Sequence, residues 1–424
     1  MPRVVVVGAG LSGCGAALAA QKAGAEVVLL ERTDMVAGVA IRAGETNGNG
    51  NFVCAHEYRF MGGGELFDAM ESIKLHDHVP FPDAALHSFI YNAGLLEPLV
   101  KKIVLAAGIK VLLESRVINV KKQGRRVTAV KVEDGSEVTG DVFVDCTGSR
   151  GGVAACNKYG KGCVMCLVKC FAFGDRIGIV DKAGGELYDR LRADGTPGYL
   201  SSAMMMFKDT LAPWLKKGIE EKGLVMVPVP KELVDYDKLK LMGASRSKEF
   251  IENICLGDIG PVAKGFGMVY MELAKLRRIN GFENVQVEDP RSARYNFIGH
   301  TGMAVRDQFM KAEGLDNVFC GGEKASQGSV GGATMSGYVA GHNAARMAFG
   351  KEPLLLPRSL AIGDFFAYVA ERKKTAEGRF LNLNVARGEY WKRMQETGLY
   401  TADVGRIKRR VEEAGLMGVL SRKL

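Results

Sequence analysis

The chain opens with an alternation of apolar and small residues that predicts a strand, a helix and a second strand. Val4 to Val7 form a run of four β-branched residues, short enough for a strand buried on both faces. Residues 14–23 are mostly small and apolar, as expected of a helix packed closely on a sheet, and Gly24 fits the end of that helix. Glu26 to Leu30 predict the second strand, which ends at Glu31.

A glycine-rich turn between the first strand and the helix predicts a dinucleotide site. It reads Gly8-Ala9-Gly10-Leu11-Ser12-Gly13. In this spacing the first glycine permits a tight turn, the second lets a pyrophosphate approach the backbone, and the third lets helix and strand pack closely. The helix N-terminus, at Leu11 and Ser12, faces the phosphate charge. Glu31, with Arg32 beside it, lies about twenty residues on, where an acid can hold the ribose hydroxyls.

Two later parts of the chain predict the rest of the same domain. Residues 111–120 and 127–132, separated by a basic turn, predict a β-hairpin, and Val142 to Asp145 predict a strand that leads into Thr147-Gly148. Far downstream, residues 317–323 predict a strand entering a turn, and the glycine-rich segment 326–332 opens a helix of small residues over 333–348.

This order of elements resembles the FAD-dependent oxidoreductases with a glutathione-reductase-like fold. The resemblance implies FAD as cofactor and an α/β fold with a FAD-binding Rossmann domain, an inserted α+β cap and a helical C-terminal region. It also implies that Thr147 and Gly148 pass near FAD and that Val117 contacts the adenine. The residues that it places at the ribityl chain and flavin ring are Gly322, Glu323, Gly331, Gly332 and Ala333.

Three stretches resemble a narrower group, the glucose-inhibited division protein A flavoproteins and the folate- and flavin-dependent tRNA uridine methyltransferases. Residues 332–346, ending Gly341-His342-Asn343-Ala344-Ala345-Arg346, are similar to the flavin-proximal helix of that group. Residues 353–368, followed by residues 380–385, are similar to the closing region of the methyltransferases. Cys54 sits where the methyltransferases carry a catalytic cysteine. This resemblance implies an alternative function in RNA uridine methylation, although their second functional cysteine has no counterpart here.

Residues 44–64 around Cys54 are polar and glycine-rich, without helix or strand periodicity, and we expect a loop. As a thiolate Cys54 could attack an electrophilic carbon, with His56, Glu57 and Arg59 available for proton transfer and anion binding. The alternative is a free thiol in a packed loop.

Four cysteines predict a second redox centre. Cys156, Cys163, Cys166 and Cys170 have the spacing C-x6-C-x2-C-x3-C, and the last three have the close spacing of ferredoxin-type iron–sulfur ligands. Zinc also accepts four thiolates, and redox-active or buried thiols are further alternatives. A 4Fe-4S cluster just after Thr147-Gly148 would exchange electrons with the flavin, and the chain has no second glycine fingerprint for NAD(P)H.

Charge and length bear on partners and organisation. The net charge is +9, and residues 351–424 hold fifteen Lys or Arg against nine Asp or Glu, a surplus of six. Such a basic region can meet RNA, but it is also common as solvated helix surface. With no apolar run long enough to span a membrane, we expect a cytoplasmic protein that does not bind membranes. Its partner would be a small-molecule substrate or an electron-transfer protein.

We expect residues 1–150 and 311–350 to form the FAD-binding domain, residues 151–310 an inserted cap with the cysteines, and residues 351–424 a mainly helical basic region. The sequence thus predicts an FAD-dependent oxidoreductase with an iron–sulfur cluster. Substrate, electron donor and oligomeric state stay open.

Overall fold

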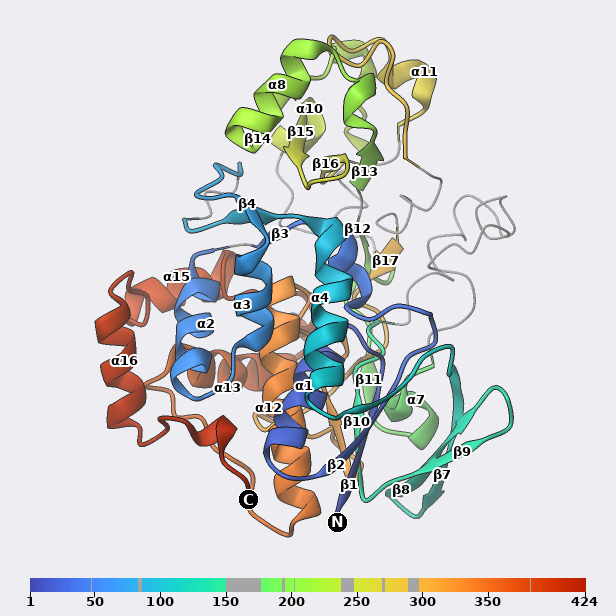
Figure 1. Ribbon diagram of the computed structural model, residues 1–424, viewed down its shortest axis with the longest axis vertical. Coiled ribbons are helices and arrows are strands. Elements are labelled where there is room, and N and C mark those ends of the chain that lie inside the picture. Colours follow the sequence, from blue (N-terminus) through green and yellow to red (C-terminus); the bar gives the residue numbers. More distant parts are fainter. Residues whose placement is uncertain are drawn as a thin grey trace.

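The computed structural model describes residues 1–46, 48–82, 86–149, 177–192, 195–201, 203–237, 248–268, 271–288, 297–381 and 383–424. A helical and sheet-containing body carries both termini, and a smaller unit stands above it (Figure 1).

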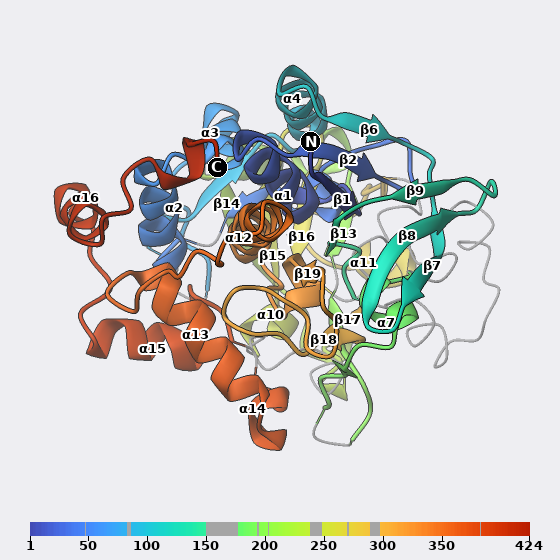
Figure 2. The same ribbon diagram turned by 90° about the horizontal axis from the view of Figure 1, so that it is seen from below.

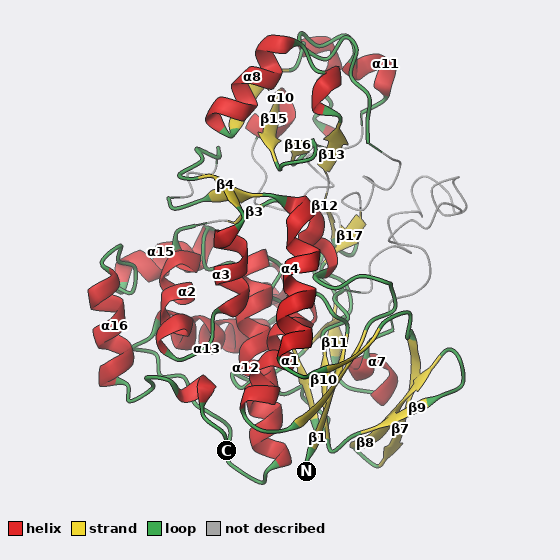
Figure 3. Cartoon of the chain, viewed as in Figure 1, coloured by secondary structure: helices red, strands yellow, loops and turns green. Residues whose placement is uncertain are grey.

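Five parallel strands form the central sheet of the body (Figure 3). In spatial order they are β19 (Val318–Cys320), β10 (Val142–Asp145), β1 (Arg3–Val7), β2 (Glu26–Leu30) and β6 (Lys110–Leu112). The register pairs Val7 with both Leu30 and Asp145, and Asp145 with Cys320. The strands therefore end level with one another, and the turns after them meet at one edge of the sheet, where open α/β sheets bind ligands.

Two helices of small residues lie side by side on the sheet, α1 (Leu11–Lys22) and α12 (Val330–Ala348) (Figures 1 and 2). A methyl group at Gly337 would overlap the backbone of Ser12, and one at Gly341 would overlap the backbone of Ala16. The spacing of four residues puts both glycines on one face of α12. The two helix backbones therefore approach much more closely than ordinary side chains allow.

An antiparallel sheet lies on the other side of the central sheet from α12 (Figure 2). It consists of β7 (Val117–Gln123), β8 (Arg126–Val132) and β9 (Glu137–Thr139), with α7 (Ile179–Ala183) packed against β7. Buried Asn317 fastens it to the strand that returns from the C-terminal half: its amide accepts from Val127 N–H at 2.9 Å and donates to Val127 O and Asp141 O, each at 2.8 Å.

The unit above the body is an antiparallel sheet with its own apolar core (Figure 1). The strand order is β13 (Ala203–Met206), β16 (Ala263–Phe266), β15 (Asn253–Asp258), β14 (Leu224–Pro228), with α8 (Pro213–Lys222), α10 (Glu249–Glu252) and α11 (Leu273–Leu276) around it. Lys264 joins it to the body by donating to Ala43 O at 2.5 Å. This unit lies within the predicted cap.

Short paired strands link these parts. They are β3 (Glu45–Thr46), β5 (Phe89–Tyr91) and β4 (Lys74–His76) in one sheet, β11 (Leu187–Tyr188) with β18 (Met303–Ala304), and β12 (Tyr199–Ser201) with β17 (Phe297–Gly299).

The C-terminal region is helical, as predicted. Its helices are α13 (Ala361–Lys373), α14 (Ala376–Phe380), α15 (Gly388–Glu396) and α16 (Val404–Glu413), the red elements of Figure 1. Two of these helices, α13 and α16, pack against α2 (Gly50–Phe60). The body also contains α3 (Glu65–Ser72) and α4 (Ala93–Ala106), which pack against each other.

Two local predictions were wrong. The segment predicted as a loop over residues 44–64 contains α2, because Val53, Cys54 and Tyr58 are buried against the core and that burial selects a helix without regular amphipathic spacing. The strand predicted over residues 111–120 is two strands: β6 joins the parallel sheet and β7 the antiparallel one, with Glu114 at φ +51° between them.

Candidate functional site: the nucleotide turn and its return segment

The three glycines of the first turn have different surroundings. Gly8 has φ +95°, and a methyl group there would lie 2.5 Å from Cys146 O. A methyl group at Gly13 would overlap Gly8 O, because helix and strand meet at that point. At Gly10 nothing lies within 4 Å of the position a methyl group would take, and its backbone has φ −63° and ψ 175°. The outer two glycines are needed for the fold, whereas Gly10 borders open space.

Glu31 closes one side of this turn. Its carboxylate accepts the Ala9 N–H at 2.8 Å and, with the other oxygen, the backbone N–H and hydroxyl of Thr33 at 2.9 and 3.0 Å. The backbone also brings the segment that leads into β7 to this point, since Ser115 N–H donates to Glu31 O at 2.7 Å. Val117, two residues on, is buried at the start of β7. Its predicted adenine contact stays a prediction, as do the roles of Arg32 and Glu31.

The C-terminal half returns to the turn at Gly321 and Gly322. A methyl group at Gly322 would lie 3.0 Å from the Ser12 side chain, and one at Gly321 would meet the same side chain. Gly322 has φ +65°, and its N–H donates to Ser336 Oγ at 2.9 Å. The structure therefore brings together the two glycine-rich segments that the sequence predicted to share one cofactor.

The start of α12 is built around its own cap. Ser329 Oγ accepts the Gly332 N–H at 2.9 Å, which satisfies one of the donors at the helix N-terminus. Gly331 lies against Asn51 of α2, so a methyl group there would be 2.5 Å from Asn51 Oδ1. Ala333 lies one turn into the helix, and its Cβ is 3.9 Å from the position that a methyl group on Gly322 would take.

The predicted Thr147-Gly148 turn is ordered by Asp145, which the sequence did not single out. Asp145 is fully buried at the end of β10, and one oxygen accepts the Thr147 N–H and hydroxyl at 3.1 and 2.7 Å. The other oxygen accepts the Val180 N–H at 3.0 Å, and Gly148 follows with φ +77°. The only sequence signal for this role is the Asp-x-Thr-Gly order itself.

These residues fit FAD. Gly10 leaves open the space that a pyrophosphate needs, α1 has no side-chain cap to occupy its first N–H groups, and β2 is followed directly by the carboxylate of Glu31. When bound, FAD supplies the redox chemistry of such a site, while the protein supplies binding and orientation. Gly10, Leu11 and Ser12 would hold the phosphates, and the return segment at Gly322 would line the same cofactor.

The fold and this turn define the class of the protein. Residues 3–157 match the family model for FAD dependent oxidoreductases, and the chain is an FAD-dependent enzyme of that fold. GidA from Aquifex aeolicus, in its form II crystal, is 17% identical with a TM-score of 0.64 over 97% of this chain and 76% of that chain. The form I crystal gives 17% identity and a TM-score of 0.63 over 97% and 78%.

A third solved structure is the flavin-dependent monooxygenase PieE in complex with FAD and substrate. It is 14% identical with a TM-score of 0.51, and the match covers 100% of this chain and 73% of that chain. At these identities the likeness is one of fold. No curated protein matches the sequence closely enough to count as a relative.

Cys54 and its neighbours on α2 serve packing in this structure. Cys54 is fully buried, and burial followed by the nearby Glu57 charge raises the pKa of its thiol well above the usual value. Glu57 is also buried and caps α13 by accepting the N–H groups of Ala361 and Ile362 at 2.8 and 3.0 Å. Arg59 is paired with Asp68 and Glu71. The catalytic role of Cys54 stays a prediction.

The four cysteines predicted to bind a cluster, Cys156, Cys163, Cys166 and Cys170, lie outside the described residues. Within the parts of the chain that are described, no group of three or more His, Cys, Asp or Glu side chains is placed to hold a metal. None of the described helices is both long and apolar enough to cross a membrane.

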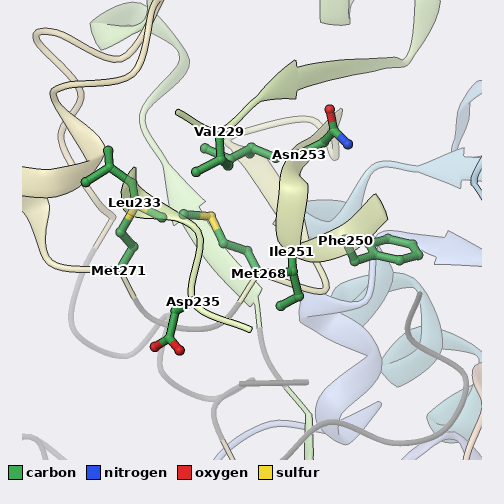
Figure 4. A pocket seen from close by; sticks show the side chains of 9 residues that line it. Val229, Leu233, Asp235, Phe250, Ile251, Asn253, Met268 and Met271 are labelled. Atoms are coloured by element: carbon green, nitrogen blue, oxygen red, sulfur yellow. The ribbon is translucent and has the colours of Figure 1, made fainter. Parts of the chain in front are cut away.

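Two hollows lie away from the nucleotide turn. The one in the upper unit is lined by apolar side chains such as Leu233, Met268 and Met271 (Figure 4), and its volume of about 30 Å³ holds only a few water molecules. The second, of about 460 Å³, lies in the C-terminal region. Four arginines line it, Arg358, Arg393, Arg406 and Arg410, together with Asp364, which forms ion pairs with Arg358 and Arg393.

Proposed function

We propose that this protein is an FAD-dependent oxidoreductase in which an iron–sulfur cluster at Cys156, Cys163, Cys166 and Cys170 exchanges electrons with the flavin. The observation that carries the flavin part is the free space beside the backbone of Gly10. Glu31 lies at one side of this turn, and Gly322 returns to Ser12 at the other. The cluster part is supported by the cysteine spacing and by its place in the chain.

The proposed ligands follow the predicted flavin turn closely along the sequence. Cys156 comes only eight residues after Gly148. The turn itself is fixed to the end of β10 by Asp145. A cluster bound there would serve as an electron entry port for a chain with one nucleotide fingerprint.

Anaerobic purification followed by iron, sulfide and zinc analysis tests the cluster. We expect flavin bands with a broad additional absorbance and close to four iron atoms per chain for a 4Fe-4S cluster. Cys163→Ala should lose the iron and keep the flavin, while Cys255→Ala, at a buried cysteine of β15 without cluster spacing, should keep both. Zinc in place of iron would overturn the electron-port proposal and leave the flavin proposal standing.

RNA uridine methylation is the second candidate, and the fold likeness to GidA is what supports it. The burial and raised thiol pKa of Cys54 weigh against it, because a thiolate is the nucleophile. The test is labelled methylene transfer from a folate to RNA by the parent protein and by Cys54→Ser. Transfer that requires Cys54 would move this function to first place, and RNA contact by the four-arginine hollow can be measured in the same samples by filter binding.

A further inference from the structure

Three cationic side chains that the sequence did not single out are buried together behind the return segment. Arg190, Arg306 and Lys373 are 2%, 4% and 6% exposed. They come from distant parts of the chain: Arg190 follows β11, Arg306 follows β18, and Lys373 ends α13. Burial, then the charges of Arg190 and Arg306, lowers the pKa of Lys373 to about 7. The three cations are therefore electrostatic neighbours.

Among the described residues, the hydrogen bonds of Arg306 and Lys373 go only to backbone carbonyls. Arg306 donates to Ala325 O at 3.3 Å, to Asp307 O at 3.0 Å and to Phe366 O at 3.1 Å, while its buried Nη2 has no acceptor. Lys373 Nζ donates to two carbonyls at 2.8 and 2.6 Å. Since a guanidinium has five N–H donors and an ammonium three, about three N–H groups remain open.

The carboxylates around these cations are engaged elsewhere. Glu186 is paired with Arg379, and Glu389 with Arg372. Asp307 accepts the backbone N–H groups of Phe309 and Lys311, and Glu323 accepts the backbone N–H of His300. Asp307 lies close enough to Arg306, and Glu389 to Lys373, to contribute charge. None of the four carboxylates, however, accepts a hydrogen bond from either of these two cations. Burial of a cation with incomplete hydrogen bonding is costly, and folded proteins keep such groups where an anion binds or a function needs them.

The cations contact the turn that leads from Gly322 into α12. Arg306 Nε donates to Ala325 O, and Tyr188, whose ring centre is 6.0 Å from Lys373 Nζ, is hydrogen-bonded to Ser326 Oγ. Ser326 has φ +68°, and His300, whose ring lies against Gly328, has φ +60°. Left-handed backbone in residues other than glycine concentrates at functional sites, and here two examples border the predicted flavin segment.

We infer that Arg306 and Lys373, with the charge of Arg190 beside them, bind a carboxylate of the substrate and so hold the substrate beside the flavin segment. This inference rests on the proposed flavin function, because the site is defined relative to the Gly322 turn. Three open N–H groups suit the two oxygens of a carboxylate, whereas a phosphate presents more oxygens and a larger charge to desolvate.

The aromatic surroundings favour an organic acid over a bare ion. The Arg190 guanidinium lies 4.0 Å from the ring centre of Tyr199, and that of Arg306 lies 5.7 Å from the ring centre of Phe366. Rings that stack on guanidinium groups also provide apolar surface for the carbon skeleton next to a carboxylate.

The test is a titration of the FAD-loaded protein with benzoate, and with inorganic phosphate at matched ionic strength. Binding is followed by the flavin absorbance and by the thermal midpoint. We expect benzoate, and not phosphate, to shift both in the parent. Arg306→Gln and Lys373→Met should weaken benzoate about 10- to 100-fold, since each removes hydrogen bonds between charged groups.

The matched control is Arg379→Gln. Arg379 also lies near the Tyr188 ring, at 5.4 Å, but it is partly exposed and paired with Glu186, so benzoate binding should be unchanged. Phosphate binding in preference to benzoate, or no shift in a parent that holds FAD, would overturn the inference. A parent that does not hold FAD would instead refute the proposed flavin function. If Arg306→Gln does not fold, Arg306→Lys keeps the charge and should show an intermediate loss.

Discussion

Gly10 and Gly13 offer a direct test of how the first turn is used, because the same substitution should have opposite consequences at the two positions. In Gly10→Ala the new methyl group meets nothing within 4 Å, and the backbone angles of Gly10 are open to any residue. Alanine lowers the entropy of the unfolded chain, which stabilises by about 0.4–1 kcal/mol, and is a poorer N-cap than glycine by a similar amount. The unfolding free energy should therefore change by less than about 1 kcal/mol.

The effect on FAD should be much larger. The methyl group would occupy the space left for the pyrophosphate, and overfilling a tightly packed contact costs about 1–3 kcal/mol, which corresponds to a loss of affinity of about 5- to 150-fold. Gly13→Ala should instead fail to fold or unfold easily, since its methyl group overlaps Gly8 O. FAD affinity measured by fluorescence quenching of the refilled apoprotein, with urea unfolding beside it, checks both. Normal FAD affinity in Gly10→Ala would refute the placement of the pyrophosphate.

Three further substitutions test other parts of the fold. Glu31→Gln should weaken FAD binding about tenfold or more by disrupting the hydrogen bonds of the carboxylate with Ala9 and Thr33. The control is Glu26→Gln, which removes a surface ion pair of β2 and should leave FAD binding unchanged. Equal losses of FAD affinity in the two variants would contradict the role of Glu31. Gly341→Ala should destabilise by about 1–3 kcal/mol in urea unfolding because α12 must move off Ala16. Gly405→Ala on α16 is the control, since its methyl group would meet only the ends of the Asp403 and Arg409 side chains, at 3.2 and 3.7 Å, and stability should change by less than about 1 kcal/mol. Burial raises the pKa of Glu57 from 4.5 to about 7. Between these pH values the folded state binds more protons than the unfolded state, so the free energy of unfolding should fall by about 3 kcal/mol as the pH rises through this window. A Glu57→Gln variant with the same pH dependence as the parent would exclude Glu57 as the cause.

The sequence by itself determined the βαβ unit and its dinucleotide site, whereas the choice of FAD came from the resemblance to the FAD-dependent oxidoreductases. Four β-branched residues, three glycines at fixed spacing and a second strand ending in an acid are local features, and the constraints they meet, tight turn, helix start and strand burial, act within about thirty residues. The return segment was predictable in kind for the same reason, since residues 317–348 carry a strand, a glycine-rich turn and a small-residue helix. The helices of the C-terminal region also followed from local pattern.

Only the tertiary structure decided which of these residues meet. Gly337 and Gly341 are helix-interior glycines whose need becomes visible once α12 lies against Ser12 and Ala16. The helix around Cys54 forms because its side chains are buried against the core, and the spacing of apolar residues in that segment does not indicate a helix. Arg190, Arg306 and Lys373 are separated by 116 and 67 positions along the chain, so their accumulation of buried charge arises from long-range packing alone. The spacing of neighbouring residues is enough to determine a turn. The buried cations affect one another electrostatically only after folding has brought distant parts of the chain together.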